Sequence, residues 1–452
     1  MTWRKKQKIA ASAIYRAVHP NKQTHTQMFG IKRKLGTTKA SLMKIAPLKL
    51  DAKKKPAAAG GGDNNKRVYV LPKARFIREE ILCKDAKDVA DMLCVYGVAI
   101  LPGVVSPKEC DAHFDAVARD METIVPTFKY DTPSTWQNLR RHGHAIHTML
   151  FQNLGVPWLP SIVKIRQNPE FARIFAELWS ELDAKNTYRA SDMLMSADGI
   201  AFHLNRSDFA HGFYREGHDW LHADKAPSDN VTSVQSFLNL CDTRRAPSDN
   251  VTSTQSFLDI IRGRADADGS RRNGCLEVIL RSHNFRKEFG ERFPSRKDVG
   301  FNLIENQEQL DFFLVEKKCE MAFVDAKKGD IVFWGSATWH QGKAAEKQPH
   351  SDVIAPAVFK RLAVYVSMQP RSYATPKDIE KKRKAFEELR ATHHPAARHV
   401  ELFPLLPRTY GQPLVAQPLA AHPELDEQGR RQWAITHGPP PPSSFFNKKQ
   451  KK

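Results

Sequence analysis

The sequence feature that most constrains the fold is the motif Trp220-Leu221-His222-Ala223-Asp224, together with a histidine about 120 residues further on. On an extended strand, residues i and i+2 project to the same side, so His222 and Asp224 can offer a nitrogen and an oxygen to one point. His340 follows a Gly-Asp turn signal and the apolar run 329–334, which is typical of a buried strand. If these three residues act together, the fold must bring two distant strands side by side.

The residue types of this motif indicate a particular metal chemistry. Two imidazoles and one carboxylate on one face of a metal, with the other positions open, are the ligand set of non-haem Fe(II) oxygenases. We therefore take His222, Asp224 and His340 as candidate metal ligands and as the catalytic centre. His218 shares the strand parity of His222 and is the alternative ligand, but it lacks a carboxylate two residues on. An isolated His-x-Asp motif is more often a surface histidine beside a solvated aspartate, so the surrounding segments must decide.

Several further segments occur in a fixed order around the motif. They are the stretch 96–107 (YGVAILPGVVSP), Cys275–Ile279, Ser282-His283, 329–334 and 361–368. In this order they resemble the phytanoyl-CoA dioxygenase family of Fe(II)- and 2-oxoglutarate-dependent oxygenases, over roughly residues 85–372. The family's Pro-Gly before the Ser-His pair is replaced here by Leu280-Arg281, which concerns the shape of a turn and not the metal ligands.

The resemblance implies a fold, an activity and a set of cofactors. The fold is mainly β with outer helices, around a double-stranded β-helix core of the jelly-roll or cupin-like kind. The activity is hydroxylation of a small organic or lipid-like substrate by dioxygen, with Fe(II) and 2-oxoglutarate as cofactors. In this family a small residue in place of Asp224 would open a halide site, so its presence favours hydroxylation.

The resemblance also implies residues that bind 2-oxoglutarate. Arg361 is the expected partner of the far carboxylate, since a guanidinium can clamp a carboxylate with two parallel hydrogen bonds. Lys360 and Arg371 are the alternatives, and Ser367 and Gln235 are further expected cofactor-binding residues. Trp220, Trp334 and Trp339 are candidates for a dry shell around the centre, although tryptophans more often serve simple core packing than a specific role.

The chain divides into three regions by composition and periodicity. We expect a basic, disordered arm at 1–66, the oxygenase domain at 67–374, and a C-terminal helix with a Pro-rich basic tail at 375–452. Within the domain, a helical layer at 85–190 is expected to lie outside the jelly-roll core at 190–374. Four helices are expected, at 86–95, from Pro107 after a Ser106 cap, at 168–183 and at 375–390. A lid or loop is expected at 286–320 and an extended segment at 404–442.

The chain repeats itself directly after the His-x-Asp motif. Residues 226–240 and 246–260 agree at twelve of fifteen positions. Two copies of twenty residues cannot form a solenoid, so we interpret the repeat as a local duplication. One copy supplies a strand of the barrel and the other extends a loop or edge, and the sequence leaves open which is which. The metal motif was not copied with it.

Charge and cysteine content bear on partners and compartment. Of a formal net charge of +20, residues 1–66 hold +14 and the last five residues +4, so about +2 remains for everything between. A basic arm attracts polyanions whatever the core does, so a nucleic-acid or nucleoprotein substrate is one alternative. A catalytically inert basic binding protein is another. Six scattered cysteines without a Cys-x-x-Cys pair, and no run of eighteen apolar residues, favour an intracellular protein without a membrane span.

Overall fold

The protein is described here by a computed structural model, which describes residues 69–141, 145–146, 150–206, 219–224, 233–245, 271–272, 274–294, 301–344, 358–407 and 414–435. By its internal contacts the chain divides into two units, Met1–Arg67 and Val68–Lys452, and all described residues belong to the second. The basic arm, His218 and the second copy of the repeat lie outside the described residues.

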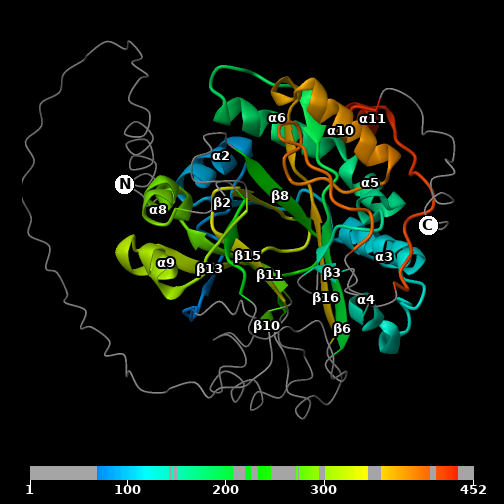
Figure 1. The fold of residues 1–452 in the computed structure, drawn as a ribbon, viewed down its shortest axis with the longest axis horizontal. Coiled ribbons are helices and arrows are strands. Elements are labelled where there is room, and N and C mark those ends of the chain that lie inside the picture. Colours follow the sequence, from blue (N-terminus) through cyan, green and yellow to red (C-terminus); the bar gives the residue numbers. More distant parts are fainter. Residues whose placement is uncertain are drawn as a thin grey trace, which may run out of the picture. The chain divides into compact units, whose positions relative to one another are not determined.

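A seven-stranded, antiparallel sheet forms one half of the core (Figure 1). Its strands, in spatial order, are β2 (Val98–Leu101), β14 (Ile331–Gly335), β8 (Val234–Asn239), β16 (Val358–Tyr365), β6 (Ile200–Arg206), β4 (Leu150–Phe151) and β3 (Ala145–Ile146). The first copy of the repeat thus supplies β8, which lies between β14 and β16. Strands β3 and β4 fall within the segment expected to be helical, and the prediction was wrong there because β4 pairs with β6 and β3 pairs with β4, which draws both into the sheet.

A six-stranded sheet forms the other half and carries the metal motif. Its strands, in spatial order, are β1 (Arg75–Ile77), β13 (Glu320–Val324), β11 (Gly274–Leu280), β15 (His340–Ala344), β7 (His222–Ala223) and β12 (Asn302–Leu303). All its pairings are antiparallel except that of β1 with β13. Two short ribbons accompany the sheets, β9 (Arg244–Arg245) with β10 (Arg271–Arg272) and β5 (Met193–Met195) with β17 (Met368–Pro370).

The two sheets pack face to face through one shared cluster of apolar side chains. Because side chains alternate along a strand, each strand contributes every second residue to this inner layer. From the seven-stranded sheet come Phe237, Trp334 and Ala363, and from the six-stranded sheet Leu276 and Val278. The fold is therefore mainly β, as expected, with its polar site built on the inner faces.

Helices cover the outer face of the seven-stranded sheet through the largest apolar cluster. They are α2 (Ala86–Val95), α3 (Pro107–Ile124), α5 (Pro160–Arg166), α6 (Pro169–Leu182), α10 (Pro376–Glu387) and α11 (Glu427–Gln432), and the short α4 (Asn138–Arg141) lies between α3 and β3 in the chain. The expected helices at 86–95, from Pro107 and at 168–183 are confirmed. Ser106 caps α3 in a reciprocal capping box with Glu109, which satisfies backbone N–H groups that would otherwise lack partners.

The outer face of the six-stranded sheet is covered by a second, smaller group of helices, beside β13 in Figure 1. They are α8 (Arg286–Arg292), α9 (Gln307–Asp311) and a π-helical turn at Phe312–Glu316. The prediction of a lid or loop at 286–320 was therefore wrong for the described residues of this segment. The aromatic side chains in this stretch decide the outcome, since Phe289 and Phe313 stack together and pack on Trp339 of the sheet.

The described residues after 374 pack onto the same body. The extended segment expected at 404–442 contains the helix α11, so this prediction was wrong in part. The indole of Trp433, which follows α11, lies 5.2 Å from that of Trp158 between ring centroids, and burial of these rings explains why the helix forms here. No helix among the described residues is long and apolar enough to cross a membrane.

Candidate metal centre

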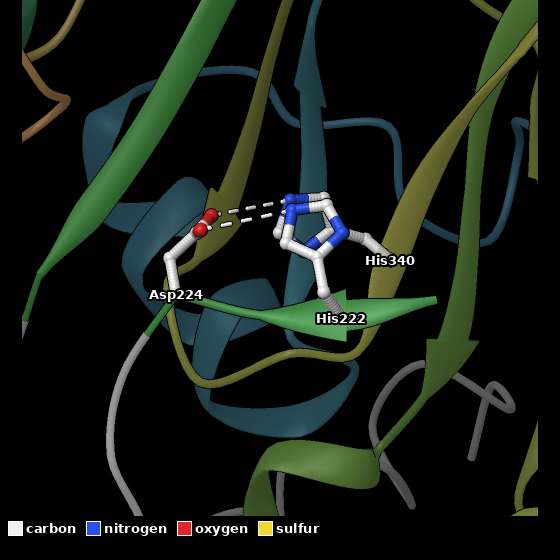
Figure 2. Close-up of side chains that lie close together, drawn as sticks. All are labelled: His222, Asp224 and His340. Carbon is white, nitrogen blue, oxygen red and sulfur yellow. Dashed lines mark ion pairs between the residues drawn. The ribbon is translucent and has the colours of Figure 1, made fainter. Parts of the chain in front are cut away.

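Three side chains meet where β7 and β15 lie side by side in the six-stranded sheet. His340 is the direct register partner of His222, and Asp224 follows β7 by one residue. One ligand atom from each of the three lies within 4.8 Å of the others. Figure 2 shows the two imidazole rings turned toward the Asp224 carboxylate. The sequence prediction of these three residues as one cluster therefore agrees with the geometry.

Backbone hydrogen bonds set the orientation of both imidazoles. Nδ1 of His222 lies 2.9 Å from the carbonyl oxygen of Trp220, and Nδ1 of His340 lies 2.8 Å from that of Thr338. A carbonyl oxygen can only accept, so each Nδ1 carries the proton and each Nε2 keeps its lone pair. These Nε2 atoms lie 3.6 Å and 3.5 Å from the oxygens of Asp224. The two Nε2 atoms and the carboxylate therefore lie close together, as metal ligands must.

The electrostatics of the cluster keep its members in the forms that bind metal. Burial, with repulsion from His340, lowers the pKa of His222 to about 3. Burial also lowers the pKa of His340. For Asp224, burial raises the pKa, but electrostatic attraction to the neighbouring imidazoles of His222, His394 and His340, together with the hydrogen bond from Gln235, more than offsets this and holds the pKa below its usual value. At neutral pH the site thus presents two neutral imidazoles and one carboxylate, which are the protonation states required of ligands.

Gln235 lies at the site, where its amide nitrogen contacts a candidate ligand. Its side-chain amide nitrogen donates to Oδ2 of Asp224 at 2.7 Å and to the hydroxyl of Ser336 at 3.2 Å. Gln235 is buried on β8, so it reaches across from the opposite sheet. It therefore orients a candidate ligand, and a direct bond from Gln235 to a cofactor remains a prediction.

Arg361 lies on β16 with its guanidinium inside the sandwich. It is buried, and its Nη1 donates to the carbonyl oxygen of Gly274 at 2.7 Å, on the facing sheet. The guanidinium carbon lies 5.7 Å from the ring centroid of Phe237, in the shared apolar layer. Its Nε has no hydrogen-bond partner among the described residues. A buried cation with unused donors is costly by itself, so the site fits a carboxylate ligand.

The alternatives to Arg361 point away from this layer. Lys360 is exposed, and its amine lies over the rings of Phe114 and Tyr130 on the helical side of the sheet. Arg371 donates to the carbonyl oxygen of Arg431. Ser367 lies between β16 and β17, where its carbonyl accepts from the N–H of Ser196, and its buried hydroxyl has no hydrogen-bond partner among the described residues.

The three tryptophans of the expected shell have different places. Trp220 stacks on His222 with centroids 4.4 Å apart, and Trp334 donates its indole N–H to Nε2 of His340 at 3.2 Å. Trp339 was assigned wrongly, because the strand alternation turns it to the outer face, among the aromatic side chains of α8 and the π-helical turn. Phe301, which was not anticipated, lies 4.7 Å from His222 and is 51% exposed.

Two residues of the site escaped the sequence reasoning. Nε2 of His394 lies 3.7 Å from Oδ2 of Asp224, and its Nδ1 is hydrogen-bonded to the carboxylate of Asp198. Burial lowers the pKa of His394, but Asp198 and Asp224 outweigh it and raise the pKa to about 9. His394 follows α10, in the region treated as a tail, and neither residue belongs to a local motif. No signal in the sequence could have paired them.

Comparison with known proteins adds little to this geometry. No protein-family model and no curated protein matches the sequence, so the resemblance to the phytanoyl-CoA dioxygenase family stays a prediction. Among solved structures, GlcNAc Inducible Gene 2 (DUF1479) from Candida albicans is 13% identical, with 68% of each chain covered and a TM-score of 0.39.

Two further solved structures are similar at the same level. EctD from S. alaskensis with 2-oxoglutarate and 5-hydroxyectoine is 13% identical, covering 76% of this chain and 94% of that chain, with a TM-score of 0.36. The non-haem α-ketoglutarate-dependent carbocyclase SnoK from nogalamycin biosynthesis is also 13% identical, covering 64% and 83%, with a TM-score of 0.33. These values are too low to carry an argument about the chemistry of this chain, which depends on its own residues.

Proposed function

We propose that this chain is an Fe(II)- and 2-oxoglutarate-dependent oxygenase that hydroxylates a small organic or lipid-like substrate, and that its two sheets form a double-stranded β-helix. The observation that carries the proposal is the convergence of His222, Asp224 and His340 on one point inside the sandwich. Two imidazoles and one carboxylate with open positions opposite are the donor set expected for iron of this kind.

The residues present fit a divalent metal ion. Both Nε2 atoms are unprotonated because both Nδ1 atoms carry protons, although that of His340 accepts the indole N–H of Trp334, and the carboxylate is anionic. When bound, the iron would supply the redox chemistry that transfers an oxygen atom of dioxygen to the substrate while 2-oxoglutarate is oxidised. The chain's own part is to hold the ligands: the backbone orients His222 and His340, and Gln235 orients Asp224.

The guanidinium of Arg361 is the proposed anchor for the far carboxylate of 2-oxoglutarate. It is the buried cation on the inner face of β16. Its Nε has no hydrogen-bond partner among the described residues and its guanidinium lies against the ring of Phe237, so a carboxylate bound there would be held strongly. A charge-assisted pair in a water-poor interior is stronger than the same pair at the surface. Ser367 and Gln235 remain proposed as further contacts.

An apolar or weakly polar substrate is favoured by the surroundings of the metal site. Phe301 leaves half of its surface exposed although its ring lies against His222, and Trp220 stacks on the same imidazole. Aromatic faces beside a reactive centre bind apolar groups through burial of surface. The near-neutral charge between the arm and the last residues agrees with a substrate that is not a polyanion.

Anaerobic titration of the full-length protein with Fe(II) and then 2-oxoglutarate tests the proposal. Bound together, the two should give a visible metal-to-ligand charge-transfer band. We expect this band in the wild type and its loss in His222→Ala. In Arg361→Gln the band should require roughly tenfold or more 2-oxoglutarate, because one charged hydrogen-bonding partner is lost. His422→Ala, at a half-buried histidine outside the site, serves as the matched control and should behave as the wild type.

Two results would contradict the proposal. One is a folded wild type that gives no band, which would favour the inert basic binding protein. The other is an unchanged band in His222→Ala, which would place the metal elsewhere. The nucleic-acid alternative is tested separately by removing residues 1–66. Turnover of the true substrate that does not change without the arm would reject it.

A further inference from the structure

His394 reaches the metal centre from a segment outside both sheets. Its Nε2 lies 3.7 Å from Oδ2 of Asp224, while its Nδ1 is hydrogen-bonded to the carboxylate of Asp198. Asp198 is fully buried, in the connection between β5 and β6. The imidazole therefore stands between two carboxylates, one of them a proposed metal ligand.

Backbone hydrogen bonds hold the segment of His394 in place. Two residues before it, the N–H of Thr392 donates to the carbonyl oxygen of Ala197 at 2.8 Å, and the N–H of Ala197 donates to the Thr392 hydroxyl at 2.9 Å. The next residue on that side of the contact is Asp198. Because these two hydrogen bonds join the segments that lead into Asp198 and His394, the position of the His394 ring is specified by the fold.

Asp198 is itself rigidly held. Its Oδ1 accepts the N–H of Gly199 at 2.6 Å, which leaves Oδ2 for His394. The guanidinium of Arg166, which is completely buried, donates to the carbonyl oxygens of Asp198 and Gly199. A buried carboxylate that is fixed in this way can orient an imidazole, as carboxylates behind metal-site histidines commonly do.

Asp224, by contrast, has few restraints of its own. It lies one residue past the two-residue strand β7, and its N–H donates to the carbonyl oxygen of Ser336 at 2.9 Å. Its carboxylate is oriented by side chains, since Gln235 donates to Oδ2 and His394 faces the same oxygen. Ligating carboxylates depend on such outer partners for their orientation.

We propose that His394, held by Asp198, is a positioning residue that keeps the Asp224 carboxylate in the orientation required to complete the metal site. The inference rests on the proposed function in one respect, namely that Asp224 is a metal ligand. It makes the affinity of the centre for metal depend on the segment that follows α10. It also gives a function to a buried Asp–His pair that the chemistry of the triad alone does not use.

The test uses Co(II) alone as the probe, with the full-length protein and no co-substrate. Bound Co(II) absorbs in the visible, and the band reports both affinity and ligand geometry. In His394→Ala we expect the Co(II) dissociation constant to rise about 10- to 100-fold, the range found for partners behind metal ligands, and the band to change shape. Asp198→Asn should weaken binding less, and His394→Gln, which can still donate to one carboxylate, should recover part of the affinity.

His393→Ala is the matched control. This neighbouring histidine faces away from the site, where its ring stacks on Phe403 with centroids 4.3 Å apart and its Nε2 lies 3.7 Å from a carboxylate oxygen of Glu401. We expect it to bind Co(II) as the wild type does. Loss in His394→Ala with no loss in His393→Ala supports the positioning role, whereas equal loss in both means general loosening of the segment and overturns it.

The remaining outcomes are also decisive. Wild-type affinity in a folded His394→Ala overturns the inference and leaves the proposed function intact. Failure of the wild type to bind Co(II) at all refutes the proposed function instead. If His394→Ala does not fold by circular dichroism, Asp198→Asn and His394→Gln decide by the same criteria, because the first keeps the shape of the side chain and the second keeps a polar side chain that can donate a hydrogen bond.

Discussion

At the scale of single residues, Gly274 determines how Arg361 lies between the two sheets. Gly274 has a φ of +130°, which favours glycine, and a Cβ at this position would lie 2.8 Å from Cδ of Arg361 and 3.1 Å from the ring of His203. Its carbonyl oxygen accepts from Arg361. The same glycine therefore leaves room for the guanidinium and provides one of its hydrogen-bond acceptors.

We expect Gly274→Ala to weaken the binding of 2-oxoglutarate by roughly tenfold and to leave Co(II) binding unchanged, because it displaces Arg361 and not the triad. Isothermal titration with each ligand separates the two effects. Gly103→Ala is the control, since Gly103 has a φ of +64° but no atom within 4 Å of an added Cβ. An equal loss of 2-oxoglutarate affinity in both variants would show that backbone strain, and not the clash with Arg361, is responsible.

At the scale of elements, the seven-stranded sheet is joined to its helical layer by aromatic contacts. Phe202 on β6 is the centre of one such group, with ring centroids 5.8 Å from Phe114 of α3 and 6.4 Å from Phe128 and from Phe151 of β4. Because β6 also pairs with β16, this packing supports the strand that carries Arg361. The cluster thus connects helix packing with the geometry of the site.

Truncation of Phe202 should remove much of this support. We expect Phe202→Ala to lower the free energy of unfolding by about 3–5 kcal/mol, the usual effect of removing a buried aromatic side chain. Urea denaturation followed by circular dichroism measures it. Val315→Ala changes an exposed residue and should have almost no effect. A comparable loss in the two variants would mean that the Phe202 cluster is not a specific support.

The helix α10 contributes a pH dependence through a buried lysine. Lys382 donates to the carbonyl oxygen of Met195, and burial, together with the charge of Arg371, lowers its pKa to about 7. Between about pH 7 and pH 10.5, the Lys382 amine therefore carries a proton in the unfolded chain that it lacks in the folded chain. The resulting penalty is full below about pH 7 and disappears as the pH rises toward 10.5.

Wild-type stability should therefore rise relative to Lys382→Met as the pH increases from about 7 to about 9.5. Thermal denaturation at several pH values measures the Tm of both proteins. We expect the Tm of the wild type to rise by a few degrees relative to that of Lys382→Met over this pH range. Lys384→Met, on the same helix but half exposed, is the control and should follow the wild type at each pH. Identical pH dependence in Lys382→Met and the wild type would mean that Lys382 titrates normally in the folded protein.

At the scale of the whole molecule, the described residues after 374 belong to the folded body. Trp158 packs against Phe386 of α10 at 5.3 Å and against Trp433 at 5.2 Å between ring centroids. His394 contacts the metal centre from the same region. The described C-terminal residues therefore complete both the apolar core and the metal site, and do not form a tail that merely follows the domain.

We expect a chain that ends at residue 374 to lose cooperative unfolding and Co(II) binding together, because it lacks these buried rings and His394. A chain that begins at residue 68 should keep both, since the internal contacts divide there. Thermal scans and Co(II) titration of the two truncations provide the comparison. Trp433→Ala is a milder test, with an expected loss of about 3–5 kcal/mol. Full stability of the chain ending at 374 would show that the C-terminal packing is dispensable.

The sequence by itself determined the ligands and much of the local structure. The period of two on a strand placed His222 with Asp224, and a cap followed by proline placed the start of α3, because both depend on residues that are near neighbours in the chain. Only the tertiary structure decided that Gln235 orients Asp224, that Trp339 faces outward and that His394 joins the site from 170 residues away. The physical reason is that such contacts depend on how strands pair and sheets pack, and no local pattern encodes which distant side chain will face a given carboxylate.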